Sequence, residues 1–381
     1  MVFRNERALL EHKGTDVVLF ERFNDDIDDA TLNKRLQVAL DGAWSKETYE
    51  QLSKLIRQTR PDLAHFHNTF PLISPSAYAA CQDNGVPVVQ TLHNYRFICP
   101  GALLMRDGHP CEDCVGTSLL PALRYRCYRG SLLATGAVVW MLARNRVQST
   151  YRTLVNRYIA LTRFAAGRLV AGGLPESRME VKANFLPNAP AMGVGGGNYA
   201  VYVGRLSEEK GVRTLVEAWR NVDGFPLKVL GDGPLRHELE EQTRRGALPI
   251  EFLGFRPHED ILNVVGNADV QVVPSECYEN FPMVVLEAYA CGTPILASRI
   301  GSLDEIVVEE ESGIKFEPGN PGDLATKLNG LLADRSRLHA MRRKARALFE
   351  QRYTAEQNYR ESLAIYDRAL ADFDDAKAPR Q

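Results

Sequence analysis

The residues with the clearest chemical potential stand in the C-terminal half of the 381-residue chain. Arg205 follows an apolar run that ends at Gly204, and Lys210 comes just before a helical pattern. Two cations beside a helix N-terminus suit a diphosphate, because the positive end of the helix dipole adds to their charge. The alternative is a solvated turn in which both cations pair with Glu208 and Glu209.

Two glutamates occur in the stretch ECYENFPMVVLEAYACGTPI. Glu279 belongs to a predicted loop, whereas Glu287 lies in a helix that Pro282 begins. The helix rises roughly 7.5 Å from Pro282 to Glu287 at ~1.5 Å per residue, so the carboxylates can contact different parts of one extended ligand. Carboxylates only accept hydrogen bonds and therefore suit the vicinal hydroxyls of a sugar or ribose. The amides of Phe281 and Met283 could meet a phosphate at the helix start.

A glycine turn, Gly231-Asp232-Gly233, follows the predicted strand LKVL and precedes a helix that Pro234 begins. Glycines allow a ligand to approach the backbone closely. The alternative is a tight turn in which Asp232 is only a local hydrogen-bond partner.

The N-terminal half offers three candidate site residues at predicted strand ends, which face the expected cleft. His93 ends the predicted strand PVVQTLH, and His67 and Asn68 follow DLAHF. A histidine at a strand end can act as a general acid or base, although most such histidines are structural.

Four cysteines gather in the loop 99–127, and two of them form a C-x₂-C pair. Four thiolates could hold a structural zinc ion, and reduced, partly buried thiols are the alternative. The four are Cys99, Cys111, Cys114 and Cys127.

The elements that must position these residues follow from the alternation of β-branched runs with helical patterns. This alternation is typical of βαβ units, in which helices cover a parallel sheet. We expect two doubly wound, Rossmann-like domains that face a cleft, joined by the Pro- and Gly-rich segment 186–199. The expected domains are 1–188 and 189–353, followed by a helix and tail at 354–381 that pack back on the first domain. Strands are predicted at 16–20, 87–93, 157–162, 201–206, 227–233, 250–255, 270–275 and 293–298.

The overall charge excludes some classes of partner. A net charge of −2 and a pI near 6.5 give no general attraction to nucleic acid. No apolar run reaches the ~18 residues of a membrane span, and no signal peptide is recognisable, so we expect a cytoplasmic protein. In the segment 124–146, a dozen mostly apolar residues lie between arginines, and we expect them to form a buried helix, with an interfacial membrane helix or a lipid contact as the alternative.

Several of these motifs together resemble one family. In order and spacing, GRLSEEKG, the GDG turn, LGF and ENFPMVVLEAYACGTPILAS resemble the donor half of family 4 retaining glycosyltransferases of the GT-B fold. The resemblance implies that Arg205 and Lys210 hold the diphosphate of a nucleotide sugar, Glu279 the sugar hydroxyls and Glu287 the ribose. It also implies that the backbone near Phe255 lies against the base. The further implied donor-binding residues are Gly204, Gly231, Asp232, Gly233, Asn280, Phe281 and Met283.

The N-terminal half is similar to a bacterial branch of this family that acts on cell-envelope or exopolysaccharide glycans. That similarity places His93 beside the reacting sugar, so the implied catalytic residues are His93, Arg205, Lys210 and Glu279. The implied reaction transfers a hexosyl group to a glycan or lipid-linked acceptor, without a catalytic cofactor or metal ion. Peripheral association with the inner face of the cytoplasmic membrane would suit such an acceptor.

The start of the sequence departs from this family. VFRNERALLEHKG resembles the first helix, but the usual preceding strand and glycine-rich loop are absent from the sequence. We therefore expect an N-terminally truncated chain that lacks its first strand. Two alternative functions are a nucleotide-sugar epimerase, which would turn over the donor without an acceptor, and an inactive binding or scaffold subunit.

Overall fold

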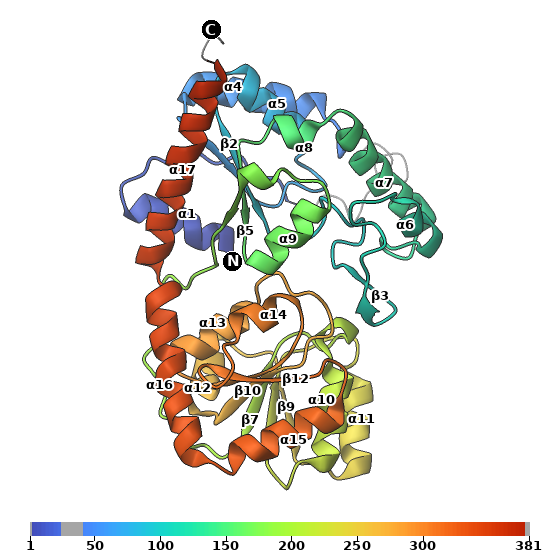
Figure 1. The fold of residues 1–381 in the computed structure, drawn as a ribbon, viewed down its shortest axis with the longest axis vertical. Coiled ribbons are helices and arrows are strands. Elements are labelled where there is room, and N and C mark those ends of the chain that lie inside the picture. Colours follow the sequence, from blue (N-terminus) through green and yellow to red (C-terminus); the bar gives the residue numbers. More distant parts are fainter. Residues whose placement is uncertain (1, 24–40, 378–381) are drawn as a thin grey trace. The chain divides into compact units, whose positions relative to one another are not determined.

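The computed structural model describes every residue except 1, 24–40 and 378–381. The chain forms two compact units, and each contains a parallel β-sheet with helices around it (Figure 1). The first unit comprises Met1–Leu104, Glu112–Lys182 and Tyr359–Gln381. The second comprises Met105–Cys111 and Ala183–Asn358. The predicted α/β class with parallel sheets is confirmed.

The sheet of the first unit has the strand order β1-β2-β5-β6, and all described pairs are parallel. β2 is buried along its whole length, as the apolar run in its sequence predicts for a strand covered on both faces. Val89 and Ile159 of this sheet pack against Ile365 and Ala369 of α17 (Ala355–Lys377). The strands are β1 (Ala64–Phe66), β2 (Val88–Leu92), β5 (Arg157–Ala160) and β6 (Met179–Val181).

The strand predicted at 16–20 is wrong. This segment is in no helix or strand, and the Val18 side chain is half exposed. A β-branched run forms a strand only where it pairs and packs with neighbouring strands, and residues 16–20 join none of the described sheets. The helical pattern before it is confirmed as α1 (Val2–His12).

The second unit has a six-stranded parallel sheet in the order β12-β11-β10-β7-β8-β9. All five strands predicted after residue 200 are present, and β12 was not predicted. The missed strand, GIKF, is short and contains a lysine, Lys315, whose Nζ lies 2.7 Å from Asp304 Oδ1. The strands are β7 (Ala200–Val203), β8 (Leu227–Leu230), β9 (Ile250–Gly254), β10 (Val270–Val273), β11 (Ile295–Ser298) and β12 (Gly313–Phe316).

Helices connect these strands in both units, and one helix belongs to both. α17 begins in the second unit and continues in the first from Tyr359. The first unit contains α1, α4 (Lys46–Thr59), α5 (Ser76–Asp83), α6 (Leu120–Tyr125), α7 (Leu132–Val147), α8 (Thr150–Thr153) and α9 (Arg163–Ala171). The second contains α10 (Val212–Ala218), α11 (Arg236–Gly246), α12 (His258–Asn267), α13 (Met283–Ala290), α14 (Gly301–Ile306), α15 (Pro321–Leu332) and α16 (Arg335–Arg352), with a small hairpin of β3 (Met105–Arg106) and β4 (His109–Pro110).

The arginine-flanked helix α7 is buried on one face only. Val138, Met141 and Leu142 are buried, whereas Leu133 is 84% exposed and Trp140 is 45% exposed. The expectation of a buried helix is therefore correct for half of its surface. Among the described residues, no helix combines the length and the apolar character needed to cross a membrane.

Candidate functional site

In the second unit, strands are added to β7 in two directions. β8 and β9 lie on one side of β7, whereas β10, β11 and β12 lie on the other. The loops after β7 and β10 therefore leave neighbouring strand ends in opposite directions, which is the usual ligand position in an open α/β sheet. These two loops carry Arg205, Lys210 and Glu279.

Lys210 and Glu279 form an ion pair between these loops. Lys210 Nζ lies 2.5 Å from Glu279 Oε1, and Ser275 Oγ donates a hydrogen bond of 2.8 Å to the same oxygen. Burial lowers the pKa of Lys210, but the Glu279 carboxylate outweighs burial and raises the pKa above its ordinary value. The lysine is thus held charged at the strand ends. Its ion pair is with Glu279 and not with Glu208 or Glu209, unlike the solvated-turn alternative.

Arg205 is exposed at the end of β7 and makes no ion pair within the described part of the chain. Its position is fixed through its backbone, because Tyr202 Oη donates to the Arg205 carbonyl at 2.8 Å. The neighbouring turns pack closely: a Cβ on Gly231, whose φ is 135°, would lie 1.9 Å from the Gly204 carbonyl oxygen. Gly231 is therefore required by backbone packing whether or not a ligand binds.

The rest of the glycine turn has local partners. Asp232 Oδ1 accepts from the Gly233 amide at 2.7 Å, and its Oδ2 lies 3.1 Å from Arg236 Nη1. This is the local role that the sequence left as the alternative for Asp232. The helix after the turn begins at Arg236, two residues later than predicted. Phe255, directly after β9, is 84% exposed and offers an aromatic face at the same sheet edge.

Glu287 occupies a different environment from Glu279. It is buried on α13, which begins at Met283 directly after Pro282, and burial raises the pKa of Glu287. His258 Nδ1, at the start of α12, lies 3.8 Å from Glu287 Oε1. Sequence reasoning missed His258, which only the spatial meeting of two helices reveals.

The segment between the glutamates lies at the start of α13. Phe281 is buried, and its ring packs edge-on against Tyr353 with centroids 5.8 Å apart. Its side chain therefore anchors the loop, which leaves only its backbone for a ligand. Asn280 precedes it, and both residues lie outside the helix.

The first unit contains a cavity of about 330 Å³ at the carboxyl ends of β1 and β2. His67, Asn68 and His93 all line it. His67 Nδ1 and His93 Nε2 are 2.8 Å apart, so one ring donates to the other. Burial lowers the pKa of His67 to about 3 and that of His93 to about 4, so both rings are neutral near pH 7.

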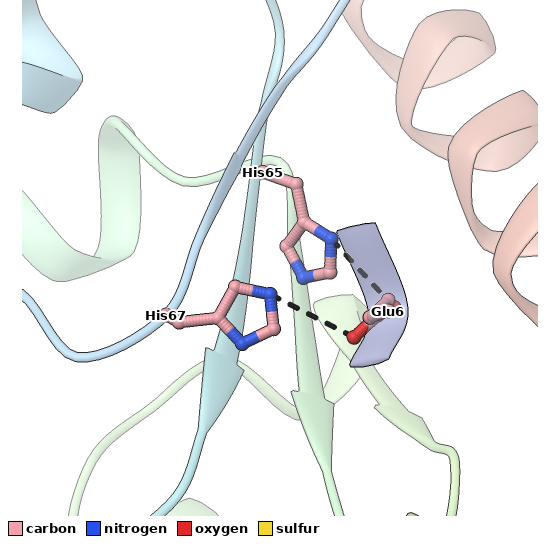
Figure 2. Close-up of side chains that lie close together, drawn as sticks. All are labelled: Glu6, His65 and His67. Atoms are coloured by element: carbon pink, nitrogen blue, oxygen red, sulfur yellow. Dashed lines mark ion pairs between the residues drawn. The ribbon is translucent and has the colours of Figure 1, made fainter. Parts of the chain in front are cut away.

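Behind this pair lies a buried charged cluster (Figure 2), which the sequence did not predict. His65 and His67 are two residues apart on an extended segment and point to the same side, toward Glu6 of α1. Glu6 Oε2 lies 3.7 Å from His67 Nε2, and Lys182 Nζ lies 2.7 Å from Glu6 Oε1. Burial raises the pKa of Glu6, but the Lys182 ammonium, together with His65 and His67, outweighs burial, and the net pKa is well below its ordinary value.

Within the described residues, Glu6, His65 and His67 are the one group of potential metal ligands whose donor atoms lie within 4.8 Å of one another. Their other contacts oppose metal binding. His65 Nδ1 is 2.8 Å from Tyr366 Oη and its Nε2 is 2.8 Å from Thr91 Oγ1, so both nitrogens already have partners. Lys182 also forms an ion pair with Glu6, and its positive charge would repel a metal ion at that carboxylate. The cluster is therefore better described as an ion-pair network that supports His67 and His93.

We expect the first unit to lose stability as the pH falls from about 6.5 to about 4. The folded-state pKa values of His65, His67 and His93 are about 4, 3 and 4, against 6.5 for a solvent-exposed histidine, so the unfolded chain binds more protons in this window. Ionised Glu6 adds a further loss below its ordinary pKa of 4.5. Urea unfolding at pH 7.5, 6 and 5, with hydrogen exchange of β1 and β2 as the local probe, would measure this. His67→Gln should flatten the dependence, and an unchanged wild-type midpoint between pH 7.5 and 5 would contradict the expectation.

The zinc site predicted from the four cysteines is not supported. Within the described chain, no three of Cys99, Cys111, Cys114 and Cys127 bring their sulfur atoms within 4.8 Å of one another, and none of the four forms a disulfide. Cys114 is buried in the first unit, whereas Cys111 belongs to the hairpin segment of the second. The C-x₂-C spacing therefore does not by itself assemble a four-thiolate site.

Two family models match the chain, one in each half. The model described as Glycosyltransferase Family 4 matches residues 4–187, and the model described as Glycosyl transferases group 1 matches residues 193–348. The first range contains the cavity residue His93, and the second contains Arg205, Lys210, Glu279 and Glu287.

Curated relatives match over part of their length. Glycogen synthase of Mycobacterium tuberculosis is 29% identical over 315 residues, which cover 79% of this chain and 66% of that protein. An uncharacterised glycosyltransferase of Methanocaldococcus jannaschii is 35% identical over 136 residues, which cover 35% of this chain and 38% of that protein. The chain thus spans less than two thirds of both relatives.

Solved structures share the fold at low sequence identity. Anabaena HepE in complex with UDP-glucose has a TM-score of 0.63 and 20% identity, and the match covers 95% of this chain and 88% of that one. Sucrose-phosphate synthase from Thermosynechococcus elongatus has a TM-score of 0.67 and 18% identity, covering 97% and 92%.

Proposed function

Because the chain belongs to the family 4 glycosyltransferases with the GT-B fold, we propose that it transfers a hexosyl group from a nucleotide diphosphate sugar to an acceptor hydroxyl. The observation that carries this proposal is the meeting of Lys210 and Glu279 between the loops after β7 and β10, beside the exposed Arg205. Cations and a carboxylate on neighbouring loops suit a ligand that is anionic at one end and hydroxylated at the other.

The proposed reaction breaks the bond between the anomeric carbon and the diphosphate while positive charge develops on the sugar. Lys210, Arg205 and the N-terminus of α13 stabilise the departing diphosphate, which carries away the bonding electron pair. Glu279 accepts hydrogen bonds from the sugar hydroxyls. The acceptor oxygen attacks the face from which the diphosphate leaves, so configuration is retained, and the leaving phosphate takes the acceptor proton. His93 lies on the acceptor side, and no step requires a metal ion.

We propose that Glu287 and Phe255 hold the nucleoside. A buried carboxylate accepts hydrogen bonds from the two ribose hydroxyls at a small cost in desolvation, because its surroundings already exclude water. The exposed ring of Phe255 offers a stacking surface for the base beside the backbone of the glycine turn. UDP-glucose occupies the HepE structure, which makes uridine nucleotides the first donors to test.

The acceptor is proposed to be a glycan or a lipid-linked glycan of the cell envelope, reached at the inner face of the cytoplasmic membrane. The exposed side of α7 supports this, because Leu133, Trp140 and Val147 recur every seven residues and therefore share one side of the helix. The lipopolysaccharide outer core galactosyltransferase WaaB shares the fold with a TM-score of 0.60 at 16% identity.

The donor proposal is tested by thermal unfolding with UDP, GDP, ADP and dTDP in turn. A nucleotide at ~100 times its dissociation constant should stabilise the protein by about 2.7 kcal/mol. Glu287→Ala should abolish this stabilisation, whereas Glu251→Ala, on the exposed face of β9, should keep it. Stabilisation by no nucleotide would favour a scaffold protein, and donor turnover without an acceptor would favour an epimerase.

A further inference from the structure

The cavity of the first unit has charge of one sign only. Its lining contains two arginines, Arg96 and Arg129, and no aspartate or glutamate among the described residues. The neighbouring His67 and His93 are neutral near pH 7, as shown above. A cavity that gathers cations without a counter-charge favours an anionic ligand.

Arg96 is held in a fixed position in this cavity. Its guanidinium carbon lies 4.7 Å from the ring centroid of Phe70 and 4.7 Å from that of Tyr128, so two aromatic rings pack against it. One Nη1–H donates to the Pro100 carbonyl, and no other side-chain hydrogen bond or ion pair of Arg96 occurs with the described residues. Burial lowers the pKa of Arg96, which an anionic partner would offset. A rigid guanidinium with unused donors is prepared for bidentate binding.

Arg129 is placed by the loop between α6 and α7. The Tyr128 amide donates to Thr135 Oγ1 at 3.0 Å, which ties this loop to the first turn of α7. Arg129 has a left-handed φ of 55°, a conformation that is unfavourable for a residue with a side chain. The fold therefore maintains an unfavourable backbone conformation at the residue that brings a second cation to the cavity.

The surroundings extend the same charge pattern. From Val115 to Pro175 the chain contains nine arginines and no aspartate, glutamate or lysine. Met141 and Leu142 on the buried side of α7 line the cavity, while the opposite side exposes its apolar residues. One helix thus separates a cationic cavity from an apolar surface.

We propose that this cavity binds a phosphate or diphosphate ester carried by the acceptor, with Arg96 and Arg129 as its ligands. The inference rests on the proposed glycosyl transfer and names the chemical class of the acceptor. Binding of the ester would hold the neighbouring sugar hydroxyl on the side of His93. The phosphate could belong to a polyprenyl diphosphate-linked sugar or to a soluble sugar phosphate, and the chemistry that Arg96 and Arg129 recognise is the same in both.

The first test is titration of inorganic pyrophosphate into the protein and into its Lys210→Ala variant, which removes the donor-side cation. We expect saturable binding that persists in Lys210→Ala and weakens at least tenfold in Arg96→Gln and in Arg129→Gln. Arg124→Gln is the matched control, because Arg124 is exposed on α6 and does not line the cavity. Arg129 is exposed, so its substitution keeps the test decisive if Arg96→Gln fails to fold.

A second comparison separates the two sources of phosphate. If the acceptor is lipid-linked, neutral phosphatidylcholine vesicles that contain undecaprenyl diphosphate should bind the wild-type protein. The Arg96→Gln variant should not bind these vesicles. Glucose 1-phosphate should compete with pyrophosphate if the acceptor is soluble. Absence of pyrophosphate binding, or equal binding by wild type, Arg96→Gln and Arg129→Gln, would overturn the proposal. Because none of these assays contains a nucleotide, their failure is distinct from failure of the proposed donor site.

Discussion

Lys210→Ala should lower kcat for glycosyl transfer by about 10²–10³-fold while the protein remains folded, because loss of one preorganised donor to a developing charge has an effect of this size. The lysine is held charged by Glu279 at the strand ends, where the diphosphate is proposed to leave. The rate of nucleotide diphosphate release, with the donor identified by thermal unfolding, measures the effect.

Arg213→Ala is the matched control for this experiment. Arg213 is also a cation close to the start of α10, but it is exposed and pairs with Glu238 at 2.7 Å. Its loss should change kcat less than threefold. If Lys210→Ala retained wild-type kcat with a nucleotide still bound, Lys210 would have no part in the reaction and the proposed leaving-group site would be wrong.

Lys182→Met should destabilise the first unit by about 3–5 kcal/mol, the usual cost of leaving one member of a buried ion pair without its partner. Glu6 is 4% exposed and Lys182 is 3% exposed, so water cannot replace the lost charge. Glu6→Gln combined with Lys182→Met should recover most of the loss, because no ionised group then remains to be compensated at that position. Urea unfolding with hydrogen exchange of the β1, β2 and β5 peptides reports the first unit.

Arg7→Met tests the specificity of this effect. Arg7 also belongs to α1 and pairs with a glutamate, Glu11, at 2.8 Å, but both side chains are about two fifths exposed. Its removal should cost less than about 1 kcal/mol. A cost of that size for Lys182→Met would mean that the cluster is hydrated and contributes little to stability.

The sequence predicted the second unit better than the first because its signals there are local. β7 and β8 are each followed by a glycine, β9 ends in one, and Pro274 and Ser275 follow β10. The parallel arrangement brings the loops after β7 and β10 together. The contact between Lys210 and Glu279 follows from that topology, although the residues are 69 positions apart. The exact partners of Asp232 and Glu287 required the structure.

The Glu6 cluster could not be predicted in the same way. Glu6, His65 and Lys182 come from α1, β1 and the segment after β6, and no short motif connects them. The alternation of His65 and His67 was a usable signal, since residues two apart on a strand share a face. The predictions of a strand at 16–20 and of a cysteine zinc site failed for a different reason. In both cases the local sequence pattern was favourable, but the fold did not supply the tertiary partners.

α17 is divided between the two units, so the first unit is built from both an early and the last part of the chain. A fragment that ends at the 186–199 linker would lack Ile365 and Ala369, and would leave apolar surface on Val89 and Ile159 uncovered. It would also remove Tyr366, the partner of His65. During ribosomal synthesis, the α17 residues that complete the first unit are therefore made only after the second unit. Until then, the core of the first unit remains incomplete.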